Sequence, residues 1–204
     1  FSSGIYGMFF VVTLYLQQVL GFSPLQAGLA WLALSLTAFT SSLVGSHIVT
    51  RVGAKAPLVA GLVLTAAGIY LLTDIPADGA YATDLLPAFL VTGLGLGSAF
   101  VAISIGSLEG VPERDAGLAS GIANTTQQIG AALGVAVLST LALERTESVL
   151  GDTPATGQAV AITEGFQLAL IGGAAFVAGA AIAAAVIVRG RDRAPRTAPA
   201  GAEA

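Results

Sequence analysis

Six long apolar stretches, separated by short polar segments, constrain this chain more than any other feature of its sequence. A bilayer core about 30 Å thick needs roughly 20 apolar helical residues to cross it. Only 10% of the residues are charged, whereas about 25% are charged in an average soluble protein. We therefore predict an all-α, multi-pass membrane protein whose transmembrane helices cover residues 2–20, 25–50, 57–73, 85–108, 116–143 and 166–188.

The positive charges are distributed unequally among the polar segments. Arg51 and Lys55 follow the second stretch, Arg114 follows the fourth, and four arginines lie beyond residue 188, whereas Arg145 follows the fifth. Short loops rich in Lys and Arg remain in the cytoplasm during insertion. This distribution predicts that both ends of the segment are cytoplasmic. Residues 1–188 then form one transmembrane unit, and the Pro- and Arg-rich residues 189–204 form a disordered cytoplasmic tail.

The residue inventory excludes several functions. The chain has no cysteine, so it has no disulfide, thiolate metal site or cysteine nucleophile. Its net charge of −4 and the lack of a basic stripe argue against nucleic acid. An intramembrane serine protease needs a serine and a histidine from another helix, but His47, the only histidine, precedes Ser120, whose flanking glycines have the wrong spacing. We expect no enzyme.

The apolar run that opens the chain has neither an initial methionine nor a basic segment before it. A secretory signal peptide would carry such a basic segment. The simplest expectation is a fragment of a longer membrane protein.

Polar side chains are concentrated in four of the six stretches and are scarce in residues 57–73 and 166–188. Polar groups in hydrocarbon seek the interior of a bundle or a watery cavity. We therefore predict that the third and sixth helices face lipid and that the other four face inward. The order polar, polar, apolar occurs twice, as expected of two three-helix repeats with inverted topology.

Small and aromatic residues add two predictions about packing. Trp31, near the outer end of its helix, is the kind of residue that anchors a helix at the membrane interface. Glycines at helical spacing let helices approach closely. We expect such packing at Gly93, Gly95, Gly97, Gly117, Gly121, Gly130 and Gly134.

Amide and hydroxyl residues near the middle of residues 116–143 are the main candidates for a binding site. Ser120, Asn124 and Gln127 recur on one helical face, and Gln128 lies beside them. The amides lie roughly 12–18 Å from the cytoplasmic end of the helix. They form either a polar wall that contacts a substrate or a set of interhelical hydrogen bonds.

Gln17 and Gln18 lie near the outer end of the first helix. Neighbouring helical residues point about 100° apart, so one of the two could line the outer mouth of a pathway while the other points elsewhere. The alternative for both is a structural role near the membrane interface.

Three segments carry a resemblance to a known family. Residues 15–29 read YLQQVLGFSPLQAGL, residues 51–55 read RVGAK, and residues 116–121 and 124–130 read AGLASG and NTTQQIG. They resemble the C-terminal six-helix half of a major facilitator superfamily transporter, in the drug:proton antiporter branch with about fourteen spans. Thr50 stands where the family often carries an acidic residue.

This resemblance implies a function. The expected protein is a bacterial plasma-membrane secondary transporter that exports amphipathic small molecules by alternating access. A proton gradient supplies the energy, and no cofactor or metal is expected. Arg51, Gly53 and Lys55 match the family's conformational turn, and a missing N-terminal half is the expected partner within the lipid bilayer.

No Asp or Glu lies at mid-depth in any of the six stretches. A proton-coupled pump needs an ionisable residue within the membrane, so we place this residue in the missing part. The alternative is a six-helix membrane module that does not transport and instead scaffolds partners or associates with itself.

Overall fold

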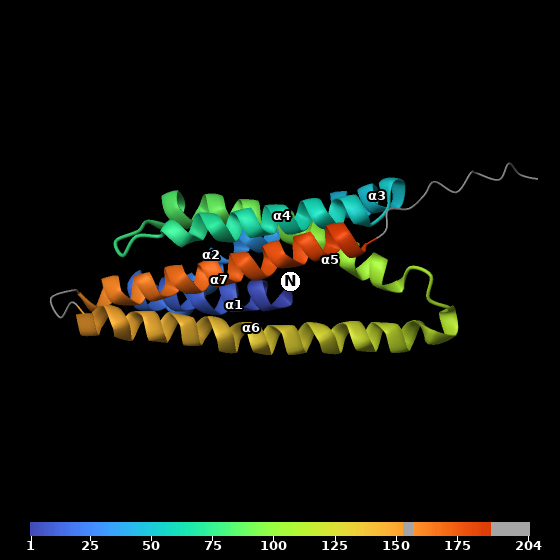
Figure 1. The fold of residues 1–204 in the computed structure, drawn as a ribbon. Coiled ribbons are helices and arrows are strands. Elements are labelled where there is room, and N and C mark those ends of the chain that lie inside the picture. Colours follow the sequence, from blue (N-terminus) through green and yellow to red (C-terminus); the bar gives the residue numbers. More distant parts are fainter. Residues whose placement is uncertain (153–156, 189–204) are drawn as a thin grey trace, which may run out of the picture.

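A computed structural model describes residues 1–152 and 157–188 as a bundle of antiparallel helices (Figure 1). The described residues contain no strand, so the all-α prediction is confirmed. The residues of the predicted tail, 189–204, lie outside the described residues. The helical elements in chain order are α1 (Ser2–Leu14), η1 (Tyr15–Val19), α2 (Pro24–Ala30), α3 (Leu32–Val52), α4 (Lys55–Leu71), η2 (Leu72–Asp74), η3 (Tyr81–Leu85), α5 (Leu86–Leu108), η4 (Glu113–Asp115), α6 (Ala116–Asp152) and α7 (Gln158–Ile187).

Five helical segments are long and apolar enough to cross a membrane. They are Pro24–Val52, Lys55–Asp74, Tyr81–Leu108, Glu113–Gly151 and Gln158–Ile187.

The remaining predicted span, residues 2–20, is not among these five segments. The Ser3 hydroxyl donates to the carbonyl oxygen of Gly130 over 2.7 Å, so α1 begins beside the middle of α6. Roughly 21 Å of α6 lies between Ala116 and that contact. Residues 2–20 therefore extend along only the part of the bundle that lies beside the second half of α6.

The last two helices are longer than the hydropathy predicts, because α6 continues past residue 143 and α7 begins before residue 166. Hydropathy marks where a chain leaves the bilayer, whereas a helix continues as long as its residues favour it and its side chains pack. Val149 and Ala161 are buried in these extensions. Arg145 of α6 also donates to Glu164 of α7 over 2.7 Å.

The second predicted helix is divided at Trp31, where α2 ends and α3 begins. Trp31, which we expected to anchor the helix at the interface, packs within the bundle. Its ring stacks on Phe89 of α5 with centroids 4.7 Å apart, and its Nε1 donates to the Thr13 hydroxyl over 3.2 Å. The break between α2 and α3 is therefore tied to both α1 and α5.

The turn before α2 follows its sequence signals. Gly21 has a φ of +69°, the left-handed conformation that commonly ends a helix. Ser23 and Gln26 then form a reciprocal capping box, in which the Gln26 side chain accepts from the Ser23 backbone N–H over 2.8 Å.

The long helices pack in two groups of three. One group contains α1, α6 and α7, the other contains α3, α4 and α5, and α4 joins the groups by packing on α7 (Figure 1). The first and fourth long helices have thus exchanged places between the two halves of the sequence. This exchange is the arrangement that two inverted three-helix repeats would produce, because α1 and α5 occupy equivalent positions in them.

Glycines permit the closest approaches within each group. Gly97 of α5 lies against the carbonyl oxygen of Ala38 in α3, and Gly95 lies against Gly61 of α4. Gly134 of α6 similarly lies against the backbone of α1. The predicted packing is confirmed at the glycines of α5 and at two of α6, namely Gly93, Gly95, Gly97, Gly130 and Gly134.

The remaining two glycines of α6 differ from the prediction. A Cβ added at Gly117 or Gly121 would meet no atom of another helix within 4 Å among the described residues, so the expected packing is wrong for this chain. Both lie in the part of α6 that extends beyond the beginning of α1.

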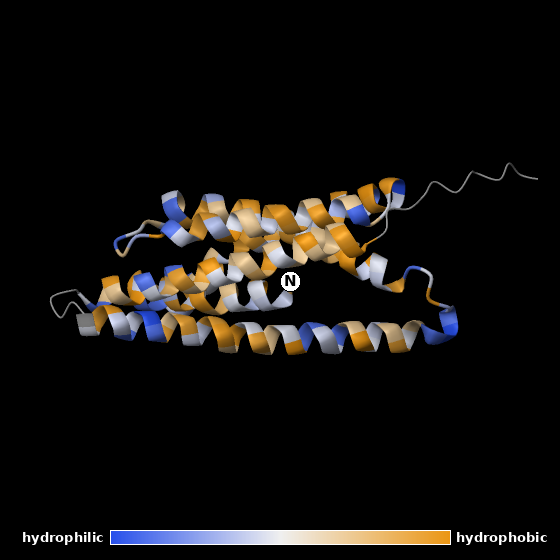
Figure 2. Ribbon diagram, in the orientation of Figure 1, coloured by the Kyte–Doolittle hydropathy of each residue, from blue (hydrophilic) through white to orange (hydrophobic). Residues whose placement is uncertain are grey.

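The helices differ in how much of their surface is buried. Only 17% of the residues in the most apolar windows of α3 and α6 are buried, compared with 50% in α4. Hydrophilic turns interrupt the middle of α6, whereas α7 is hydrophobic over most of its length (Figure 2). The polar side chains of α3 and α6 were expected inside the bundle, but this chain leaves many of them exposed because its other helices cover only one flank.

Candidate functional site

Two neighbouring cavities, which share several lining residues, lie beside α1 and are bounded by α3 and α5 on one side and α6 on the other. The larger cavity, here called the polar chamber, has a volume of about 800 Å³. Its walls are the beginning of α1, the second half of α5 and the first half of α6. Its hydroxyl and amide side chains come mainly from α5 and α6, namely Ser104, Ser107, Ser120, Asn124, Thr126 and Gln127.

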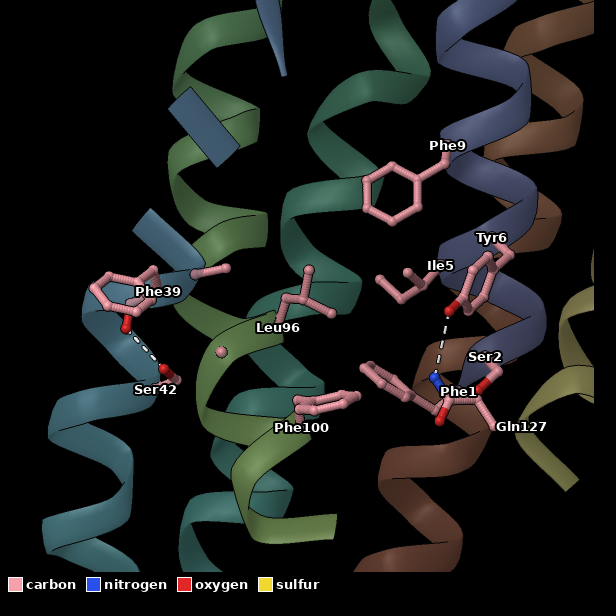
Figure 3. A pocket seen from close by; sticks show the side chains of 12 residues that line it. Phe1, Ser2, Ile5, Tyr6, Phe9, Phe39, Ser42, Leu96, Phe100 and Gln127 are labelled. Atoms are coloured by element: carbon pink, nitrogen blue, oxygen red, sulfur yellow. Dashed lines mark hydrogen bonds between the residues drawn. The ribbon is translucent and has the colours of Figure 1, made fainter. Parts of the chain in front are cut away.

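The smaller cavity, here called the aromatic chamber, has a volume of about 330 Å³ (Figure 3). Rings from three helices face it, and they are Phe1, Tyr6, Phe9, Phe39 and Phe100. Gln127 and Phe100 line both chambers, so they mark the boundary between the two. Both volumes lie within or close to the range of about 300–1,000 Å³ that is usual for small-molecule sites.

The polar chamber exists because only the second half of α6 packs against α1. Near the start of that half, Gly130 accepts a hydrogen bond from Ser3 of α1, and Gly134 packs against the backbone of Ser3. Between Ala116 and Leu133, no residue of α6 is buried. The first half of α6 therefore stands away from α5 and leaves the space that its polar face lines.

Two threonine hydroxyls in the first half of α6 bond to their own helix. Thr125 and Thr126 donate to the backbone carbonyls of Gly121 and Ile122 over 2.8 Å and 2.9 Å. Such bonds satisfy a hydroxyl without any partner helix. The threonines of this face therefore do not require a ligand.

The amide groups of the same face are not satisfied in this way. The Gln127 Nε2 donates to the Tyr6 hydroxyl of α1 over 3.3 Å, and Asn124 has no hydrogen-bond partner among the described residues. An amide removed from water without a partner costs about 1–3 kcal/mol. Asn124 is exposed in this chain, so within a bilayer its amide avoids that cost only where it meets water, a ligand or another part of the protein.

The structure brings together part of the predicted site. Ser120, Asn124 and Gln127 line the polar chamber. Gln128 follows Gln127 directly but lines neither chamber and is exposed, because one residue turns a helix by about 100°.

Gln17 and Gln18 lie far from this group. Both are in the π-helical turn η1, which follows the C-terminal end of α1, and both side chains are exposed. Neither lines one of the two chambers.

The turn at Arg51, Gly53 and Lys55 lies at the opposite end of the bundle from η1 and lines neither chamber. Gly53 ends α3 with a φ of +85°, and its N–H donates to the carbonyl of Val49 over 2.9 Å. Arg51 is exposed at the last turn of α3.

The aromatic chamber was not predicted from the sequence. Phe1, Ile5 and Phe9 recur every four residues on α1, which was an available signal for a common face. An aromatic ring in an apolar helix resembles a lipid-facing residue, however, so only the packing shows that these rings meet Phe39 and Phe100.

Charged side chains are absent from both chambers over the part of the chain that the structure describes. No Asp, Glu, Lys, Arg or His lines them. Residues 1–152 and 157–188 also contain no cluster that could hold a metal ion. The chambers can therefore recognise a molecule through apolar contact and neutral hydrogen bonds.

Long apolar helices around a cavity with neutral polar walls define the class of the molecule, a multi-pass membrane protein of the transporter type. Comparison with known families then shows to which family the chain belongs. Residues 1–135 match the Major Facilitator Superfamily, and the chain belongs to it. The members of this family are membrane transporters and not enzymes.

Several bacterial proteins are similar to this chain. The puromycin resistance protein pur8 of Streptomyces alboniger is 38% identical over 73% of this chain and 30% of its own length. The tetracenomycin C resistance and export protein of Streptomyces glaucescens is 35% identical over 72% of this chain and 27% of its own length. The multidrug efflux pump LfrA of Mycolicibacterium smegmatis is 31% identical over 68% of this chain and 27% of its own length. The chain thus spans less than a third of these relatives.

Proposed function

We propose that this chain is the C-terminal half-bundle of a proton-coupled exporter of amphipathic small molecules in a bacterial plasma membrane. The observation that carries the proposal is the unpaired Asn124 amide beside Gln127 in the wall of the polar chamber. The names of the relatives, which refer to resistance, export and efflux, support the outward direction. The superfamily match favours this function over a scaffold that does not transport.

The remaining part of the transporter is the partner that we propose for this half. Exposed polar side chains on α3 and α6 are unfavourable against lipid, and a second bundle would cover them while leaving a shared cavity. Rocking of the two halves about that cavity would then give alternating access. Because neither chamber contains an acidic side chain among the described residues, the proton-binding carboxyl group belongs to the remaining part.

The orientation that we propose follows from the charged turns. The α3–α4 and α5–α6 turns lie at one end of the bundle, and they carry Arg51, Lys55 and Arg114 (Figure 1). This end faces the cytoplasm. Arg51, Gly53 and Lys55 form a turn that changes with the conformational state, and Gln17 or Gln18 lies at the outer mouth.

The test uses the full-length transporter reconstituted in vesicles. A proton gradient should drive movement of puromycin or tetracenomycin C across the membrane, and dissipation of the gradient should stop it. Asn124→Ala and Gln127→Ala should change the preference between the two compounds more than they change protein abundance. The proposal fails if no gradient moves either compound. Parallel losses of protein and transport would assign both amides a purely structural role.

A further inference from the structure

The boundary between the two chambers has a chemistry of its own. Gln127 of α6 and Tyr6 of α1 meet at this boundary, and Figure 3 shows their side chains pointing toward one another. Their hydrogen bond measures 3.3 Å, which is longer than the usual 2.9–3.0 Å for such bonds. A long bond of this kind is easily exchanged for one to a ligand.

Both side chains keep hydrogen-bonding capacity beyond this contact. The Gln127 amide retains its carbonyl oxygen and a second N–H, and the Tyr6 hydroxyl, which accepts from Gln127, retains its own proton. The structure gives these groups no further partner among the described residues. The boundary thus presents two donors and one acceptor at a single point.

The two spaces on either side of this point differ in composition. Five of the twelve residues that line the aromatic chamber carry rings, and rings favour offset or edge-to-face contact with another ring. The polar chamber instead presents Asn124 and the hydroxyls of Ser104 and Ser107. A molecule that filled both would need a flat apolar end and an end rich in hydrogen-bonding groups.

We infer that Tyr6 and Gln127 select uncharged, two-part ligands, with an aromatic ring in the aromatic chamber and a hydroxyl-rich part in the polar chamber. The pair recognises the oxygen or nitrogen atom that joins the two parts. The lack of any charged side chain in the walls excludes a requirement for charge on this part of the ligand. The inference rests on the proposed function, because it specifies the ligand class of the same cavity.

Two fluorescent probes distinguish recognition of the aromatic part of a ligand from recognition of its hydroxyl-rich part. 1-Naphthyl β-D-glucopyranoside carries a ring, a linking oxygen and a sugar, whereas the hydrocarbon 1-phenylnaphthalene carries only rings. Binding of each is measured with the purified full-length transporter in lipid nanodiscs. Tyr6→Phe removes only the hydroxyl, so glucoside affinity should fall about three- to tenfold, the effect of one neutral hydrogen bond. The affinity for 1-phenylnaphthalene, which has no hydrogen-bonding atom, should stay within about twofold.

Further variants locate the effect. Asn124→Ala should weaken only the glucoside, and this substitution removes no hydrogen bond within the described part of the protein. Phe39→Leu should weaken both probes by a similar factor. Tyr70→Phe, on the exposed face of α4, is the matched control and should change neither.

The inference is overturned if the unsubstituted protein binds neither probe, or if Tyr6→Phe weakens both probes equally or neither. These outcomes are independent of the vesicle experiment. A transporter that moves puromycin but shows equal losses for the two probes retains its proposed function and loses the two-part site.

Discussion

Gly97 of α5 and Ala38 of α3 lie so close that the carbonyl oxygen of Ala38 occupies the place where a side chain at residue 97 would begin. Gly61 of α4 meets Gly95 on the opposite side of α5 in the same way. Because backbone faces backbone at both contacts, α5 is held between two helices with no side chain that could adjust. Packing is a main source of helix association in lipid, where the hydrophobic effect contributes little.

Substitution of this glycine should therefore be costly. Gly97→Ala places a methyl group against the Ala38 backbone and should lower the free energy of unfolding by about 1–3 kcal/mol. The measurement is the Tm of the purified transporter in detergent. Gly179→Ala on α7, where no atom lies within 4 Å, is the control and should leave the Tm unchanged or slightly raised. Equal effects at both positions would contradict the close approach.

Thr92 of α5 is fully buried, and its hydroxyl has no hydrogen-bond partner in the structure. Thr92→Val replaces that hydroxyl by a methyl group of similar size and should raise the free energy of unfolding by about 1 kcal/mol. Thr65→Val is the matched control, because the Thr65 hydroxyl donates to the Gly61 carbonyl over 2.8 Å. A lower Tm for Thr92→Val than for Thr65→Val would show that Thr92 has a partner after all.

The ion pair between Arg145 and Glu164 joins the extensions of α6 and α7 at 2.7 Å, but both side chains are more than a third exposed. We therefore expect Glu164→Gln to lower the free energy of unfolding by at most about 1 kcal/mol. A double-mutant cycle with Arg145→Gln should isolate the coupling, which should shrink as the salt concentration rises. A coupling that salt leaves unchanged would argue against simple surface attraction.

The absence of cysteine from this chain permits a direct test of orientation. Single cysteines are introduced by Asp78→Cys or Glu113→Cys, with any cysteines elsewhere in the transporter removed. In intact cells, a membrane-impermeant maleimide should label residue 78 and should reach residue 113 only after permeabilisation. The reverse pattern would invert the orientation that the positive charges predict.

Some of the architecture was predictable because it depends on neighbouring residues. The capping box of Ser23 and Gln26 and the left-handed Gly21 follow from local backbone chemistry. The glycines of α5 also predicted close packing, although the sequence did not indicate which helices they pack against. Helix ends were less accurate, because α6 continues beyond the apolar stretch that the sequence shows.

The candidate site, too, was only partly predictable from the sequence. Hydropathy and residue type are properties of single positions, so the chain alone indicates a membrane bundle and marks Asn124, Gln127 and Gln128 as unusual within it. The rotation of α6 about its axis depends on its contacts with α1, and no local pattern specifies that angle. Packing of Gly134 against Ser3 turns Gln127 toward Tyr6 and leaves Gln128 outside both chambers. The aromatic chamber likewise forms only where three helices distant in sequence converge, because each supplies rings that alone would face lipid.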